Sequence, residues 1–276
     1  MGTRFALAAV ATFAGSALAI DINSVNSVQV VNRVFNDFPT STLTNVANFP
    51  AEVSWHEEFP AGTVGNFANK HLAYLSNDGG ASAYQHYPGQ GFTLGFDARL
   101  AAPGVAPRKE GVLQIENPRP GLGFTDEGHV LIGSEGEIAI FGGVMPFFSC
   151  RVPGSAGIGA VGVDGSDWYA PGENARITFR YYAPGEVDAV LGGYELTYQG
   201  VNGFRSSGVK LWGNAEPDGT VGFNFGTKIA FQIQNQRNPV INDMSDAQYT
   251  NITLVPAPGA LALIGLGGLA AARRRR

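Results

Sequence analysis

Short apolar runs recur along most of the chain, and several alternate between hydrophobic and polar positions with a period of two residues. The clearest run places Ile229, Phe231 and Ile233 on one side and Gln232 and Gln234 on the other, which is typical of a strand with one buried and one wet face. The runs are rich in Val, Ile, Phe, Tyr and Thr, which favour strands. The pattern predicts strands over residues 28–35, 52–59, 71–76, 92–100, 111–116, 129–133, 137–141, 175–182, 193–198, 208–212, 221–225, 228–234 and 247–254.

Turn signals separate these runs. Glycines that follow Asn or Asp favour positive φ and tight reversals, and they occur within residues 77–80, 164–165, 202–203 and 218–219. No segment carries the capped pattern of period 3.6 that predicts a long helix. About a dozen strands with this spacing predict an all-β fold, one antiparallel two-sheet β-sandwich of jelly-roll or concanavalin-like type over residues 20–254.

The two ends of the chain differ from this domain. Arg4 precedes an apolar run over residues 5–14, and Ala17 and Ala19 supply the small residues of a signal-peptidase site. Residues 1–19 are therefore predicted to be a signal peptide, which signal peptidase removes. Export would leave the β-sandwich outside the cytoplasm.

The C-terminal segment, residues 255–276, begins with Val255, Pro256, Ala257 and Pro258. Fourteen apolar or glycine residues follow, over 259–272, and the chain ends on Arg273, Arg274, Arg275 and Arg276. A helix of this length spans roughly 21 Å, short of the ~30 Å hydrocarbon core, so it predicts a short transmembrane helix rather than a permanent anchor. The arginines are expected to keep the end of the chain in the cytoplasm.

This arrangement resembles the PEP-CTERM sorting signal of Gram-negative bacteria, with Ala257 at the position where Glu is usual. The resemblance implies handover to exosortase, a membrane protease, and a place in the cell envelope, on the outer surface or in the exopolysaccharide matrix of a biofilm. A plain C-terminal anchor is the alternative interpretation. The end of the domain, residues 245–254, also resembles the closing strand of bacterial carbohydrate-binding jelly rolls.

Charge narrows the choice of partner. All 23 acidic residues, but only 13 of the 18 Lys and Arg, lie between the two end segments, so the domain carries a charge of about −10. This balance argues against nucleic acid, which is bound through basic contacts to phosphates. Cys150 is the only cysteine and cannot form an intrachain disulfide. It is either buried and inert or available for an intermolecular bond.

No catalytic motif emerges from the sequence. The run that starts at Glu137 resembles the Glu-Ile/Leu-Asp-x-x-Glu strand of laminarinase-type hydrolases, but Ala139 and Gly142 stand where that strand has its other acids. Glu57 and Glu58 are adjacent on a predicted strand and point to opposite faces, so at most one of them can share a site with Trp55 or His56. A solvated strand face is the favoured interpretation. The four histidines, His56, His71, His86 and His129, lack the spacing of a zinc site.

No metal ligand is assigned. Structural calcium is an open possibility at two places, residues 164–167 and the pair Asp243 and Asp246, although both are ordinary turn compositions. For glycan binding, an exposed aromatic ring is needed to pack against a sugar. Trp168 and Tyr169, in a glycine-rich stretch between strands, are the candidates, with Trp55 and Trp212 as alternatives.

The preferred hypothesis is an exported, non-catalytic envelope or matrix protein with weak binding to extracellular polysaccharide. The alternative is a polysaccharide-degrading enzyme whose carboxylates come from separate strands. An adhesin or assembly subunit is a third possibility. The enzyme hypothesis requires two carboxylates to meet in one groove, chosen from Glu52, Glu57, Glu58, Glu135, Glu137 and Glu195.

Overall fold

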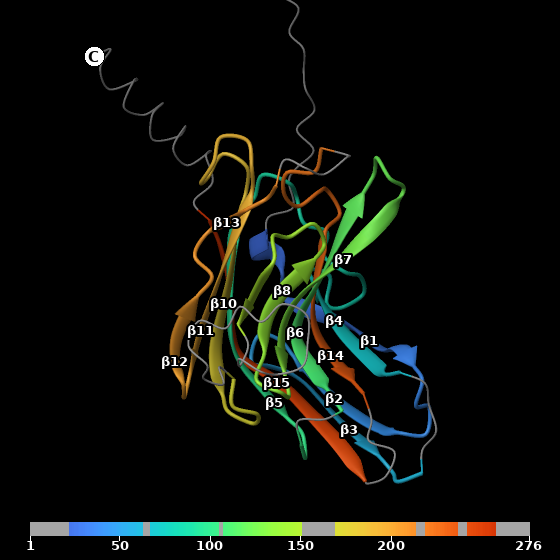
Figure 1. The fold of residues 1–276 in the computed structure, drawn as a ribbon. Helices are drawn as coiled ribbons and strands as arrows, with labels where there is room; N and C mark the ends of the chain where they lie inside the picture. The colour runs from blue at the N-terminus through green and yellow to red at the C-terminus, as the bar shows by residue number, and fades with distance from the viewer. Residues whose placement is uncertain are drawn as a thin grey trace, which may run out of the picture.

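The computed structural model describes residues 22–62, 67–104, 107–150, 169–213, 219–236 and 242–257, which form two antiparallel β-sheets packed face to face (Figure 1). The seven-stranded sheet has the order β1 (Ser27–Asn36), β4 (Asn69–Ser76), β14 (Lys228–Asn235), β6 (Lys109–Arg119), β7 (Phe124–Gly133), β8 (Ile138–Gly142) and β9 (Phe148–Cys150). The eight-stranded sheet has the order β12 (Gly203–Ser206), β11 (Gly193–Gly200), β10 (Ala175–Tyr182), β5 (Phe92–Ala101), β15 (Asp243–Pro256), β3 (Glu52–Phe59) and β2 (Thr42–Asn48), and β13 (Lys210–Leu211) pairs with β11. A 3-10 turn, η1 (Ile22–Ser24), precedes β1.

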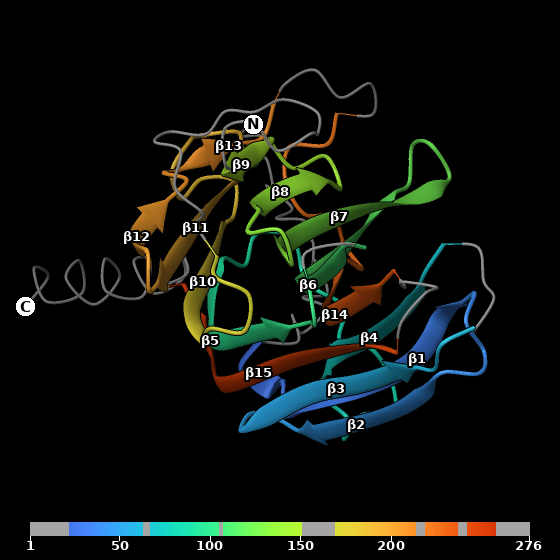
Figure 2. The ribbon, with the colours of Figure 1, turned by 60° about the horizontal axis from the view of Figure 1, so that its bottom comes forward.

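The chain crosses between the two sheets at almost every connection in its first half. Strand β3 lies in the eight-stranded sheet, β4 in the seven-stranded sheet, β5 in the eight-stranded sheet and β6 in the seven-stranded sheet, and β14 and β15 repeat the crossing (Figure 2). In the middle of each sheet, neighbours are therefore distant in sequence, as β14 is from β4 and β6, and β15 from β3 and β5, an arrangement seen in jelly rolls. This topology confirms the predicted all-β, two-sheet antiparallel sandwich.

The core lies between the sheets and is filled by alternate residues of the facing strands. Phe96 of β5 packs edge-on against Phe231 of β14, with ring centroids 5.2 Å apart, and Tyr249 of β15 stacks on Phe231 at 5.0 Å. All three side chains are buried. Each contributes about 1.5–3 kcal/mol of apolar burial, so the contacts that join the sheets are also a main source of stability.

Most predicted strands are present, and two have the predicted bounds, β3 and β10. The sequence pattern missed β2, β9 and β12, which are edge or short strands without clear alternation. It was wrong over residues 221–225, which form no strand. There, the backbone N–H of Phe223 donates to the Tyr181 hydroxyl (3.0 Å) rather than to a neighbouring strand.

The predicted reversals are confirmed where the structure describes them. Gly79 and Gly80 have φ of 74° and 92°, and Gly203 has φ of 104°. At Gly80 a Cβ atom would also approach the carbonyl oxygen of Val28 to 2.7 Å, so a side chain is excluded by contact as well as by backbone strain.

The end of the domain extends further than the sequence pattern indicated. Strand β15 continues through Val255 and Pro256, and the backbone N–H of Ala257 donates to the Gly91 carbonyl (2.8 Å), so these residues of the expected sorting motif belong to the sandwich. Ala17, Ala19, Pro258 and Arg273 to Arg276 lie outside the described residues. Within the described ranges, no helix has the length and apolar character needed to span a membrane.

Candidate functional site

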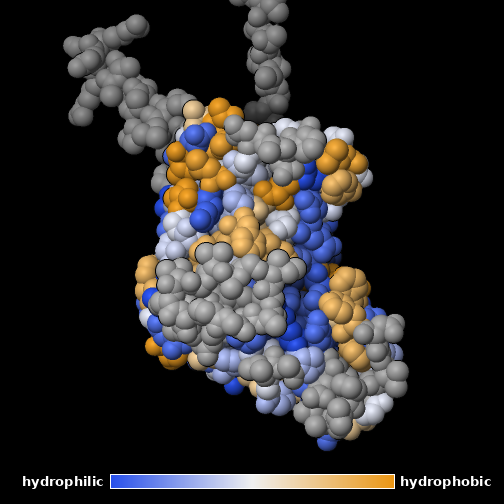
Figure 3. Space-filling view, viewed as in Figure 1, coloured by the Kyte–Doolittle hydropathy of each residue, from blue (hydrophilic) through white to orange (hydrophobic). Residues whose placement is uncertain are grey.

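The outer side of the seven-stranded sheet carries an unusual set of polar side chains. On β4, β14, β6 and β7 alternate residues point into the core, among them Ala73, Phe231, Leu113 and Val130, so the residues between them point outward. Figure 3 shows a hydrophilic band down this side of the molecule. We call this surface the polar face and define it by Lys70, Tyr74, Glu110, Gln114, Glu116, Glu127, His129, Lys228 and Gln232.

Glu116 is the centre of one hydrogen-bonded group on the polar face. Its carboxylate accepts from Gln114 Nε2 (3.1 Å), lies 3.4 Å from Lys228 Nζ and accepts a hydrogen bond from the Tyr74 hydroxyl. Burial, and then the bond to Glu116, raise the pKa of Tyr74 well above its usual value. The tyrosine is therefore a proton-bearing donor at neutral pH.

His129 lies opposite Gln114 in the β6–β7 register and is neutral. Burial, followed by the nearby Lys70 charge, lowers the pKa of His129 to about 4. Gln232 Nε2 lies 3.2 Å from His129 Nδ1 and donates to it, which places the ring proton on Nε2. The polar face therefore holds an uncharged imidazole.

Lys70 spans the polar face and shows that this side of the sheet is concave. Its Nζ lies 3.5 Å from Glu127 Oε2, although β14 and β6 lie between the strands that carry the two residues. Two side chains can meet across two intervening strands only where the sheet curls towards them. Burial lowers the pKa of the Lys70 amine, while the Glu127 carboxylate opposes that shift.

Two amide oxygens on the polar face are buried without a hydrogen-bond partner. They are Gln114 Oε1 and Gln232 Oε1, and their residues are only 2% and 1% exposed. An unsatisfied buried acceptor costs about 1–3 kcal/mol, so proteins rarely keep one without a reason. The alternation predicted that Gln232 would be exposed to solvent, and its burial shows that this prediction was wrong. Both oxygens are acceptors that a ligand hydroxyl could satisfy.

Exposed aromatic rings flank these polar strands. Phe35 of β1 pairs in register with Lys70, and Phe141 of β8 pairs with His129, so each ring lies on the outer side of the sheet. Phe35 is 47% exposed and Phe141 is 37% exposed. Lys70 Nζ lies 5.5 Å from the Phe35 ring centre, and the His129 and Phe141 rings are 5.2 Å apart. Exposed aromatic rings therefore border the polar face on both sides.

Three carboxylates share one guanidinium at one end of the polar face. Arg108 pairs with Glu110 (2.6 Å), Glu135 (2.8 Å) and Glu137 (2.7 Å). Burial and the neighbouring carboxylates of Glu135 and Glu137 raise the pKa of Glu110 against the pull of Arg108. Glu137, the one acidic residue in the run that resembles the laminarinase strand, is therefore part of an ion-pair cluster. It also accepts a hydrogen bond from the Ser149 hydroxyl (3.0 Å).

Glu57 is not on a solvated strand face as predicted, but completely buried between the sheets. It shares the inward parity of Trp55 on β3, while His56 and Glu58 point outward and are 3.1 Å apart. Glu57 accepts from Ser41 (2.6 Å), Asn69 (2.6 Å), Asn235 (2.7 Å) and His71 (3.2 Å). These bonds join β3 to β4 and β14, so Glu57 ties the two sheets together.

Of the six candidate carboxylates of the enzyme hypothesis, Glu135 and Glu137 meet at one residue, Arg108. Glu52 binds Ser54 and Gln248, and Glu195 binds Tyr182 and Ser206, on the outer side of the other sheet. The structure instead places Glu116 and Glu127 opposite each other in the β6–β7 register of the polar face. Sequence reasoning missed this pair because a register is not readable from either strand alone.

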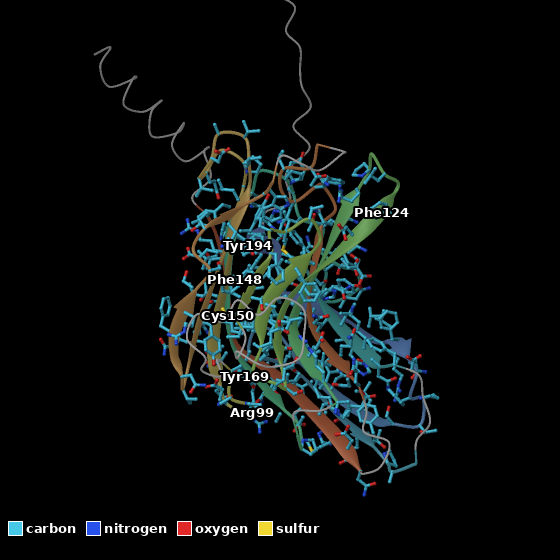
Figure 4. All side chains as sticks on the ribbon, in the orientation of Figure 1. Arg99, Phe124, Phe148, Cys150, Tyr169 and Tyr194 are labelled. Atoms are coloured by element: carbon cyan, nitrogen blue, oxygen red, sulfur yellow. The ribbon has the colours of Figure 1, made fainter. Side chains whose placement is uncertain are left out.

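The aromatic residues expected to bind glycan are elsewhere. Tyr169, labelled in Figure 4, is a core residue and not an exposed platform. Its hydroxyl accepts a hydrogen bond from the Leu100 N–H (2.6 Å) and donates one to the Leu100 carbonyl (2.8 Å). Trp55 and Trp212 are also buried. Trp168 lies outside the described residues. The sequence could not reveal this, because a tyrosine can be buried when its hydroxyl finds a hydrogen-bond partner, and that partner is not visible in the residues next to it.

The suggested calcium pair is separated by the pleat of β15. Asp243 points inward, where Lys109 Nζ donates to it at 2.6 Å, while Asp246 points outward to His56 Nδ1 at 2.5 Å. They cannot share an ion. Among the described residues, no three His, Cys, Asp or Glu side chains are arranged to hold a metal. Residues 164–167, the other suggested calcium site, lie outside the described residues. Cys150 is buried.

The outer side of the eight-stranded sheet has a separate hollow of about 330 Å³. His56 lies in it between Asp246 and Glu58, whose hydrogen bonds raise the pKa of His56. Arg99 also lines the hollow and donates from Nε to the Gly172 carbonyl (3.1 Å). The polar groups described here satisfy one another, unlike the amide oxygens of the polar face.

No protein-family model and no curated protein matches this sequence. Among solved structures, the chain is similar to a family 7 alginate lyase in complex with product, with 10% identity and a TM-score of 0.47 over 85% of this chain and 96% of that one. An alginate lyase from Chlorella virus has 12% identity and a TM-score of 0.44 over 85% and 94% of the two chains. The Lotus tetragonolobus seed lectin has 11% identity and a TM-score of 0.35 over 83% and 99%. Similarities of this size carry no argument about what this chain binds.

Proposed function

We propose that this protein is an exported polysaccharide-binding protein and that the polar face is its binding surface. The observation that carries the proposal is the pair of buried, unpartnered amide oxygens of Gln114 and Gln232 beside the Tyr74–Glu116 group. Sugar hydroxyls are donors of the kind these oxygens lack. The flanking rings of Phe35 and Phe141 could pack against the apolar faces of sugar units, as aromatic side chains do in ligand sites.

Export and sorting are part of the same proposal and rest on the two end segments of the sequence. A signal peptide would direct the chain out of the cytoplasm, and the tail that begins at Val255 would deliver it through an exosortase-type protease to the envelope or matrix. We expect the native product to lack residues 1–19 and the four terminal arginines. Mass spectrometry of the protein isolated from its own cells checks this, and an intact arginine end on a cytosolic molecule would refute it.

The binding proposal predicts a specific effect of removing one ring. Phe141→Ala should weaken polysaccharide binding roughly two- to tenfold, the equivalent of the 0.5–1.5 kcal/mol that an aromatic contact contributes. The matched control is Phe204→Ala, because Phe204 is 57% exposed on β12 of the other sheet. Affinity electrophoresis in gels containing soluble polysaccharides measures both variants. Equal affinities for the two, or no retardation of the parent protein by any polysaccharide, would contradict the proposal.

Cleavage of the bound polysaccharide is a second candidate function. The register pairing of Glu116 and Glu127 on one concave surface favours it, since glycosidases act through two carboxylates on either side of the scissile bond. Reducing ends that appear in incubations of the parent protein, but not of Glu116→Gln, would establish it. Binding without release of reducing ends would leave the non-catalytic function alone.

A further inference from the structure

We infer that the ligand of the polar face is a neutral, hydroxyl-rich glycan and not a polyuronate, an inference that rests on the proposed function. The described residues of the face offer mainly hydrogen-bond acceptors. The amide oxygens of Gln114 and Gln232 have no donor, and the carboxylates of Glu116 and Glu127 have further lone pairs. An acceptor-rich surface is complementary to hydroxyl groups, which bring the missing protons.

The cations of the face are already committed to carboxylates. Lys70 pairs with Glu127 at 3.5 Å, and Lys228 pairs with Glu116 at 3.4 Å. The guanidinium of Arg108 is shared by three acids. To bind a sugar carboxylate, a lysine would have to release a glutamate that then lies unpaired beside the ligand's own negative charge. Such a release gains no net electrostatic energy.

The remaining charge of the face is negative. Together with the Arg108 group, five carboxylates, of Glu110, Glu116, Glu127, Glu135 and Glu137, stand against three cations, of Lys70, Lys228 and Arg108. His129 adds no charge, because burial lowers its pKa to about 4. Repulsion between like charges in a concave, partly desolvated surface is stronger than in open water. Each uronate unit would therefore weaken binding.

The test compares hexasaccharides of the same length by isothermal titration calorimetry on the full-length chain. The neutral set is β-1,3-glucan, β-1,4-glucan and β-mannan, and the acidic set is polygalacturonate and polymannuronate. We expect the best neutral hexasaccharide to bind at least about tenfold more tightly than either hexauronate, a difference near 1.4 kcal/mol. Raising the salt until the Debye length falls to about 8 Å should strengthen uronate binding and leave neutral binding unchanged.

Matched substitutions locate the effect. Glu127→Gln keeps the shape of the side chain and frees Lys70 from its ion pair. It should therefore reduce the difference in affinity between the uronate and the neutral hexasaccharides. Glu58→Gln, the same change on the other sheet, should leave this difference unchanged. A hexauronate that binds as tightly as the neutral sugars would overturn the inference while the proposed function stands. Failure of every sugar to bind would overturn the proposed function itself.

Discussion

Replacing Glu57 with alanine is expected to lower the free energy of unfolding by about 3–5 kcal/mol, the usual cost of breaking a buried, hydrogen-bonded charge site. The side chain is completely buried, and its loss leaves the donors of Ser41, Asn69, Asn235 and His71 without their acceptor. His71 Nδ1 accepts from the Arg33 N–H (3.0 Å), so its Nε2 proton is the one donated to Glu57. Urea unfolding at neutral pH measures the change as a shift in midpoint with an unchanged slope.

The same carboxyl gives stability a defined pH dependence. Burial alone would raise the pKa of Glu57, but the bonds from His71, Ser41 and Asn69 outweigh it and leave the pKa below the ordinary 4.5. A carboxyl group whose pKa is lower in the folded than in the unfolded protein stabilises the fold at pH values above the unfolded-state pKa. This stabilisation is lost as the pH falls through the folded-state pKa. The difference in the free energy of unfolding between the parent protein and Glu57→Gln should therefore shrink below pH 4.5.

Glu58→Gln is the matched control for this experiment. It changes the next residue of β3, whose side chain is 62% exposed and bonded to the half-exposed His56, so its effect should stay within about 1 kcal/mol. A loss of stability in Glu57→Ala no larger than in Glu58→Gln would show that the cluster does not tie the sheets together.

Phe223→Ala is expected to cost about 3–5 kcal/mol, as large-to-small changes of buried aromatic residues do. The Phe223 ring is 3% exposed and stacks on Tyr181 with centroids 4.1 Å apart. It also meets the edges of Trp212 at 5.5 Å and His86 at 5.7 Å. The substitution would open a cavity among these three rings and Phe92, whose ring lies 6.4 Å away, and the closely packed rings cannot easily fill it. Thermal or urea unfolding measures the loss.

The chain supplies a close control two residues away. Phe225 is 61% exposed and touches only the Tyr87 ring among the aromatic contacts described, at 5.7 Å. Phe225→Ala should therefore change stability by less than about 1 kcal/mol. Equal losses for the two variants would mean that the segment is held by its backbone and not by the Phe223 ring.

These two sites show what sequence patterns can and cannot resolve. The pattern identified β3 with its observed bounds, but it did not assign Glu57 to the buried side, although Trp55 of the same parity pointed to it. It also predicted a strand through Phe223, because an apolar run of that length is compatible with a strand or a packed loop. Gly222 decides between them: a Cβ there would approach the Tyr181 hydroxyl to 2.8 Å, so the segment packs on that residue.

The polar face was inaccessible to sequence reasoning for a different reason. Tyr74, Gln114, His129 and Gln232 come from four strands, of which only β6 and β7 are consecutive in the chain. Each residue occupies an ordinary outward position of its own strand. Only the pairing registers bring them together. The glycan-binding rings were sought at Trp168 and Tyr169, but Tyr169 is in the core, and the exposed rings beside the polar strands are Phe35 and Phe141.

The sequence by itself determined the class of fold, because the period of two residues and the turn glycines are local properties that each strand carries alone. The proposed export likewise rests on the sequence of the two end segments alone. The tertiary structure alone decided which polar residues meet, which are buried and which charges neutralise one another. Those outcomes depend on contacts between segments far apart in the chain, as when Lys70 of β4 reaches Glu127 of β7 across two intervening strands.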